Sequence, residues 1–175
     1  ILKDGKHKEG FTGFNPFKID PSLTGKALAT TITAQASNFA TVVQSIYNQS
    51  GVSDPYFSSL NETVTISIAE LLMLTYHLVH PGQVPKASDV QNLINDCSRC
   101  RPYLDALIKY YSVHSLRGNG NDRTEQVAEV VDVGQWQQVY TTINNDLLGE
   151  NKANMYDRCN GLRNLINNFL NDPLV

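Results

Sequence analysis

The stretch NETVTISIAELLMLTYHLV, residues 61–79, decides the fold. Its first half alternates apolar residues with Thr and Ser, which is the pattern of a half-buried strand. The whole stretch also carries apolar or Thr side chains at helical spacings, namely Val64, Ile68, Leu71, Leu72, Thr75, Leu78 and Val79. Ordinary strands run about 4–8 residues, and this stretch is far longer, so it predicts a helix. Because that helix is apolar on most sides, we expect it to be central.

Short polar segments on either side predict where this helix begins and ends. Residues 59–62 (SLNE) match a capping box and predict its start, with Ser53-Asp-Pro55 forming a separate turn or single helical turn before it. Pro81-Gly82 predicts its end.

Upstream, Asp20-Pro21 predicts the start of another helix, because Asp is a favoured cap and Pro a favoured first helical residue. That helix is expected to reach about Gln49, with the apolar stripe Leu28, Ile32, Phe39, Val43 and Ile46.

The C-terminal half predicts further helices separated by polar turns. Ser88 is the expected cap of a helical stripe that continues past Pro102. A proline costs about 3 kcal/mol inside a helix, so this is either one kinked helix or two helices meeting near Arg101. Residues 117–122 (RGNGND) predict a surface loop. A later apolar stripe is predicted to end at Gly149. The last helix is expected to carry the stripe Met155, Cys159, Leu162, Ile166 and Phe169.

Together these patterns predict an all-α protein with a single antiparallel bundle of five or six helices. The chain of 175 residues is long enough for one domain with its own core. We expect the bundle over residues 21–175 and an extended N-terminal arm over residues 1–20, where Gly and Pro interrupt any helical period.

The arm holds three of the six Phe residues, Phe11, Phe14 and Phe17, in the segment FTGFNPF. Their spacing of three lets all of them face one way in an extended, polyproline-like segment. The predicted helices already have their own apolar stripes, so these rings need another surface to cover. We therefore predict that Phe11, Phe14 and Phe17 bind a partner, either a neighbouring copy or the arm's own bundle.

Composition limits the classes of partner. The net charge is −3, and no basic footprint for nucleic acid stands out, although a few Arg residues on one face would still permit such binding. Charged residues make up only 18% of the chain, so much of the polar surface is expected to be amide and hydroxyl. No apolar run approaches the length of a membrane span, so none is expected. The first residue is Ile1, which predicts a processed form or part of a longer chain, and the sequence assigns no compartment.

The three cysteines, Cys97, Cys100 and Cys159, give the sharpest local motif, C-S-R-C. A C-x-x-C pair can bind zinc if other ligands join it, can form a disulfide with Cys159, or can be a pair of structural thiols. We treat the structural role as the expectation and keep Cys97, Cys100 and Cys159 as weak metal candidates.

His77 and His80 lie three residues apart, which suits either half of a metal site or interaction with a helix C-terminus. No cofactor is predicted.

No nucleophile motif, phosphate loop or dinucleotide fingerprint is present, so the sequence predicts a protein that is not an enzyme. The leading hypothesis is a structural or interaction subunit whose aromatic arm docks on a neighbouring copy or partner, as in coats or filaments. The alternative is a monomeric, exported helical bundle that binds a protein or a small apolar ligand, with the arm as its own lid. The third hypothesis is a metal-binding protein that uses Cys97 and Cys100.

Overall fold

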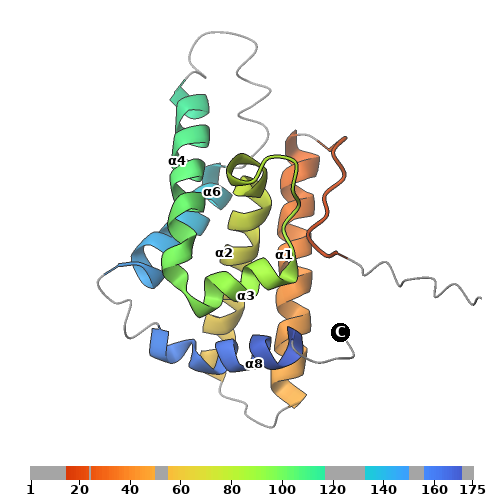
Figure 1. Cartoon of the computed structure of the whole chain (residues 1–175), viewed down its shortest axis with the longest axis vertical. Helices are drawn as coiled ribbons and strands as arrows, with labels where there is room; N and C mark the ends of the chain where they lie inside the picture. The colour runs from red at the N-terminus through yellow and green to blue at the C-terminus, as the bar shows by residue number, and fades with distance from the viewer. Residues whose placement is uncertain (1–14, 24, 50–54, 117–132, 150–155, 171–175) are drawn as a thin grey trace, which may run out of the picture.

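The computed structural model describes residues 15–23, 25–49, 55–116, 133–149 and 156–170 (Figure 1). Its elements in chain order are α1 (Gly25–Gln49), α2 (Pro55–Val79), α3 (Ala87–Asn95), the 3₁₀ turn η1 (Cys97–Cys100), α4 (Arg101–Leu116), α6 (Val133–Thr141), the π-helical η3 (Thr142–Leu147) and α8 (Asn160–Leu170). Within these ranges the chain forms helices and no strand. The predicted all-α class is confirmed.

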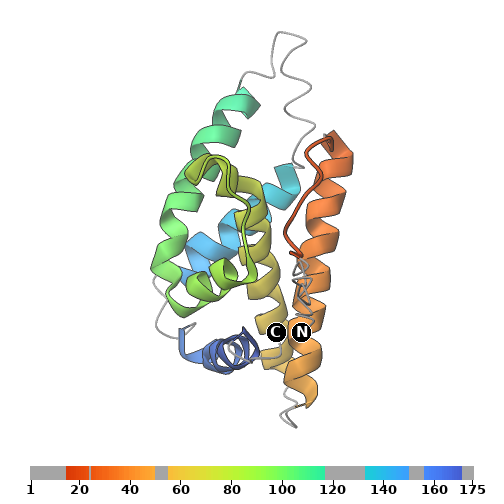
Figure 2. The ribbon, with the colours of Figure 1, turned by 45° about the vertical axis from the view of Figure 1, so that its right-hand side comes forward.

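Helix α2 lies at the centre, in contact with α1, α3, α4 and α6. It runs antiparallel to α1, whereas α4 runs in the same direction as α2 (Figure 1). α3 and α8 lie across these long helices, and α8 crosses the end at which α1 finishes and α2 begins (Figures 1 and 2). The all-α prediction therefore holds, but the finer expectation of one antiparallel bundle is not confirmed.

Two buried Thr residues of α2 satisfy their hydroxyl groups within the helix itself. Thr65 and Thr75 are buried, yet their hydroxyls donate to the carbonyl oxygens of Asn61 and Leu71, one turn earlier, at 2.7 and 2.6 Å. Each hydroxyl is thus satisfied within its own helix and can lie in the core at little cost. The fully buried apolar side chains of this helix are Val64, Ile68, Ala69, Leu71, Leu72 and Leu74.

By length and composition alone, the segment Ser59–Val79 of α2 could cross a membrane, so the expectation of no membrane span stays a prediction. The most apolar window of this segment is 67% buried inside the protein. The core helix of a soluble protein has the same length and composition, so composition does not assign α2 to a bilayer.

The predicted starts of the first two helices are wrong. The first helix begins at Gly25 rather than after Asp20, because the Asp20 carboxylate accepts hydrogen bonds from the amide and hydroxyl of Ser22, at 2.8 and 2.7 Å, and closes a turn. Gly25 then has φ = 55°, a conformation that glycine adopts without strain. α2 begins at Pro55, so Ser59 lies inside the helix and does not cap it.

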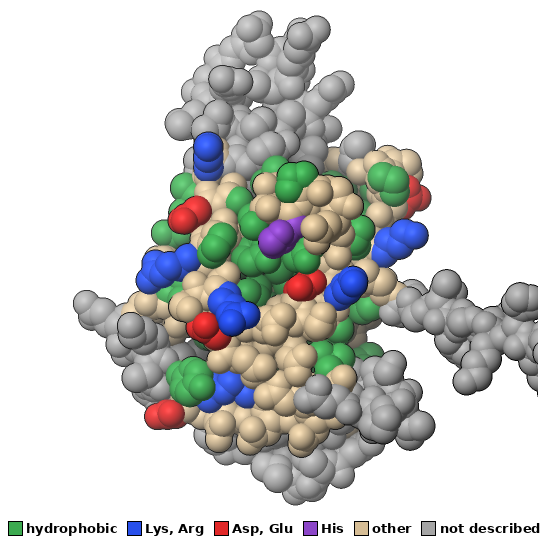
Figure 3. Space-filling view, in the orientation of Figure 1, with side chains coloured by type: hydrophobic (Ala, Val, Ile, Leu, Met, Phe, Trp, Pro, Cys, Tyr) green, Lys and Arg blue, Asp and Glu red, His purple; other side chains and the backbone are tan. Residues whose placement is uncertain are grey.

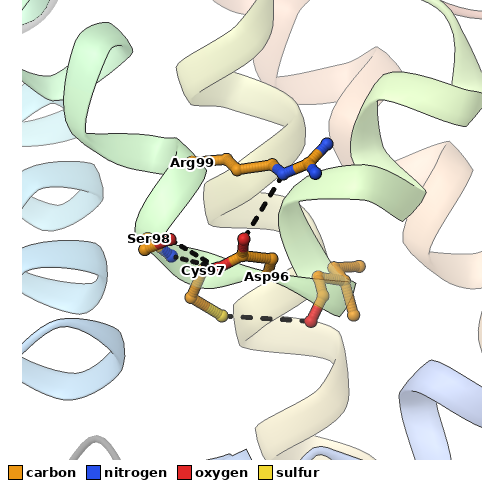
Figure 4. A network of polar contacts seen from close by, with 5 residues as sticks. Asp96, Cys97, Ser98 and Arg99 are labelled. Atoms are coloured by element: carbon orange, nitrogen blue, oxygen red, sulfur yellow. Dashed lines mark hydrogen bonds and ion pairs between the residues drawn. The ribbon is translucent and has the colours of Figure 1, made fainter.

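The start of α3 also differs from the prediction. Ser88 was the expected cap, but the cap position is Lys86, whose amide donates to the Asp89 carboxylate at 2.8 Å. At Pro102 the two-helix alternative is correct: η1 separates α3 from α4, and Pro102 lies in the first turn of α4, where proline is tolerated. The Asp96 carboxylate holds this corner by accepting from the amide and hydroxyl of Ser98, at 3.2 and 2.5 Å, as Figure 4 shows.

Hydrogen bonds between side-chain amides position α8 against α3. Asn167 of α8 accepts from the amides of Gln91 and Asn95 of α3, at 2.8 and 2.9 Å, and donates back to Asn95 at 3.1 Å. Some of the many Asn and Gln side chains therefore form hydrogen bonds between helices rather than lying on the surface.

Gly149, the predicted stop, follows η3 at a point where a Cβ would collide with the carbonyl oxygen of Asn145.

Candidate functional site

The segment of residues 15–23, which precedes α1, packs against the protein's own helices. The Asn15 side chain donates to the carbonyl oxygen of Pro85 at 2.9 Å and accepts from the amide of Phe17 at 3.0 Å. The Gln35 side chain on α1 donates to the carbonyl oxygen of Lys18 at 3.4 Å. These contacts join the segment both to α1 and to the turn after α2.

Phe17 is the apolar anchor of this segment. Its side chain is only 1% exposed, and its ring meets that of Phe39 edge-on, with centroids 4.9 Å apart. Of the three predicted partner-binding rings, Phe17 therefore lies in the core of its own chain. Phe11 and Phe14 lie outside the described residues.

A pocket of about 410 Å³ lies between this segment, α1, the end of α2 and the turn at residues 83–85. Ligand pockets commonly measure about 300–1,000 Å³ and are mainly apolar. Most of the lining side chains here are apolar: Phe17, Ile19, Pro21, Leu23, Leu28, Ile32, Met73, Leu74, Tyr76, Val84 and Pro85. The polar lining residues are Asp20, His77 and Gln83.

The polar lining residues set the electrostatics of the pocket. Hydrogen bonds from the Ser22 side chain and backbone hold the pKa of the Asp20 carboxyl below its usual value, so this side chain is an anion at neutral pH. Partial burial lowers the pKa of His77, which favours the neutral imidazole. Among the described residues that line the pocket there is neither Lys nor Arg. The described lining thus offers a negative charge at the exposed Asp20 and an imidazole whose neutral form is favoured.

The aromatic side chain of Tyr76 forms part of the pocket wall and also interacts with residues of α3 and α4. Its ring stacks on that of Tyr103 from α4, with centroids 6.1 Å apart. Burial raises the pKa of Tyr76, and the nearby Asp89 carboxylate of α3 raises it further. The phenol is therefore neutral and is a poor candidate for a nucleophile.

His80 belongs to this aromatic group rather than to a metal site with His77. Its Nε2 lies 3.0 Å from the Tyr103 hydroxyl, and its ring is 4.7 Å from that of Tyr76. His77, by contrast, lines the pocket. Figure 3 shows hydrophobic side chains gathered on the face that carries α3 and α4, with a histidine at their edge. Within the described part of the chain, no three His, Cys, Asp or Glu side chains are placed to hold a metal ion.

The cysteines lie at the corner between η1 and α8. All three thiols are free; Cys100 and Cys159 are buried and Cys97 is partly exposed. Burial raises the pKa of each, that of Cys159 to about 11, although the nearby Arg163 partly opposes the shift at Cys97 and Cys159. Thiolates are the form that binds metals and attacks disulfides. High pKa values therefore favour the structural role that the sequence predicted for these thiols.

Sequence reasoning did not identify the pocket. Ile19 and Leu23 precede α1, and Val84 and Pro85 lie in the connection from α2 to α3. No helical period marks an apolar residue as buried in either segment. The available signal was the presence of apolar residues in Pro-containing segments on both sides of the first two helices. Comparison of the chain with protein-family models, with curated proteins and with solved structures finds no match.

Proposed function

We propose that this chain is a non-enzymatic binding protein for a small, mainly apolar molecule, which occupies the pocket beside residues 15–23. The observation that carries this proposal is an apolar cavity of about 410 Å³, which lies within the usual size range for ligand sites. The driving force is removal of apolar surface from water, worth about 25 cal/mol per Å².

The packing of residues 15–23 supports the role of the arm as a lid. Phe17 and Ile19 contribute to the wall of the pocket, and the Asn15–Pro85 hydrogen bond ties the segment to the turn on the opposite side. In this proposal the end of the arm nearest to α1 belongs to the site itself. A ligand would contact the arm, α1 and α2 together and would stabilise the folded protein by mass action.

A bulky side chain at the pocket, Val84→Trp, is expected to weaken binding of decanol about fivefold or more, because overpacking the ligand-filled site costs about 1–3 kcal/mol. Val84 is 43% exposed, so the larger ring can be accommodated without disturbing the core. Isothermal titration calorimetry with decanol measures the change. The matched control is Val42→Trp on α1, because Val42 is 49% exposed and does not line the pocket. Equal affinities in the two variants, or no binding to the unaltered chain, would rule out this pocket as the site.

Self-association through the arm is the second candidate function, now carried by Phe11 and Phe14 alone. Phe11 and Phe14 lie outside the described residues, so their role stays a prediction from the sequence, whereas the Phe17 ring lies in its own core. Removal of residues 1–14 leaves Phe17 in place and is expected to convert an oligomer to a monomer, as measured by light scattering at micromolar concentrations. An unchanged mass after this truncation would exclude the arm as the assembly element.

A further inference from the structure

We infer that the pocket discriminates by charge and prefers a hydrophobic amine to a carboxylate with the same hydrocarbon chain. This inference rests on the proposed binding function and names the class of ligand. It comes from the distribution of charge around the pocket, where Asp20 is the one charged side chain among the described lining residues.

Asp20 is held in place by its own turn. Its carboxylate accepts from the amide and the hydroxyl of Ser22, at 2.8 and 2.7 Å, and Leu23 donates its amide to the Asp20 carbonyl oxygen at 3.1 Å. Neither bond to the carboxylate comes from a cation, so its negative charge is not neutralised by these contacts. Because Asp20 is exposed, it can meet the polar end of a ligand whose apolar part enters the pocket.

The nearest charges in the sequence do not cancel this preference at the site. Lys18 and Lys26 are exposed, and neither is among the lining residues. His77 lines the pocket, and burial favours its neutral form. An ammonium group beside Asp20 is therefore attracted, and a carboxylate is repelled, since the described lining residues include no Lys or Arg to bind it.

The size of the effect follows from the exposure of Asp20. Exposed ion pairs change an equilibrium by a factor of about two to five. Attraction of the amine and repulsion of the carboxylate multiply, so we expect about a fourfold to 25-fold preference at low ionic strength. Salt screens exposed charges, and the preference should shrink as ionic strength rises.

The test compares decylamine, decanol and decanoate, which share one alkyl chain, by isothermal titration calorimetry on the unaltered chain and on Asp20→Asn. Asparagine retains an oxygen that can accept from Ser22 and so preserves the turn, but it removes the charge. The expected order of affinity is amine, alcohol, carboxylate, and Asp20→Asn should bring the three within about twofold of one another. Lys18→Gln is the matched control: it also removes one charge from the segment and should leave the order unchanged.

The outcomes separate the two proposals. If all three probes bind the unaltered chain equally, or if Asp20→Asn leaves the order intact, the charge preference is overturned while the pocket remains a binding site. If none of the three binds, the proposed function fails and the charge preference falls with it.

Discussion

Replacement of Phe17 by alanine is expected to lower the free energy of unfolding by about 3–5 kcal/mol, the usual cost of removing a buried phenylalanine ring. The side chain is 1% exposed and its ring packs edge-on against Phe39. Its loss leaves a cavity and also releases the segment of residues 15–23 from α1. Urea denaturation followed by circular dichroism measures the change.

Lys18→Ala is the control for this prediction, because Lys18 is the next residue and its side chain is exposed. Gln35 contacts the backbone oxygen of Lys18 and not its side chain, so that hydrogen bond survives the substitution. We expect the control to change stability by no more than about 0.5 kcal/mol. Equal stability of the two variants would contradict the packing of Phe17. If Phe17→Ala instead reduced the mass in solution without loss of stability, the ring would dock on a neighbouring copy.

The second large effect is expected in the central helix, where Leu72→Lys should abolish cooperative folding. Leu72 has no exposed surface and lies in the core with residues from α1, α3 and α4. An unpaired buried charge costs several kcal/mol, and the lost leucine contributes about 2–5 kcal/mol more. Together these costs are comparable to the whole stability of a typical domain, about 5–15 kcal/mol. Thermal unfolding and amide dispersion in NMR spectra measure the outcome.

The matched control is Thr63→Lys, which adds the same charge to the same helix at an exposed position. Lysine has a higher helix propensity than threonine, so this variant should be as stable as the unaltered chain. A folded Leu72→Lys protein with a melting temperature close to that of Thr63→Lys would show that α2 is not the central core helix.

Helix type was predictable from the sequence because periodicity accumulates over many residues. In the stretch 61–79 the length and the repeated apolar spacing outweighed the local strand-like alternation, and the buried hydroxyls of Thr65 and Thr75 bond within the helix. Helix ends depend on single residues and were less predictable. Asp20 and Ser59 both have the chemistry of a cap, but one closes a turn ahead of α1 and the other lies within α2.

The candidate site was much less predictable. Its lining joins residues 17–23 to residues 83–85, and the hydrogen bond that ties these segments together links Asn15 to Pro85. No local pattern reports a contact over that separation. The FTGFNPF segment indicated that its rings need a surface to cover, but only the packing against Phe39 assigns Phe17 to its own bundle.

The sequence by itself determined the all-α class and the central apolar helix. Both depend on a repeat along a single segment. Only the tertiary structure decided the pocket, the separation of His77 from His80 and the place of Asp20 at the lining. The physical reason is that connections without a helical period are positioned by long-range packing and hydrogen bonds, whose partners lie elsewhere in the chain.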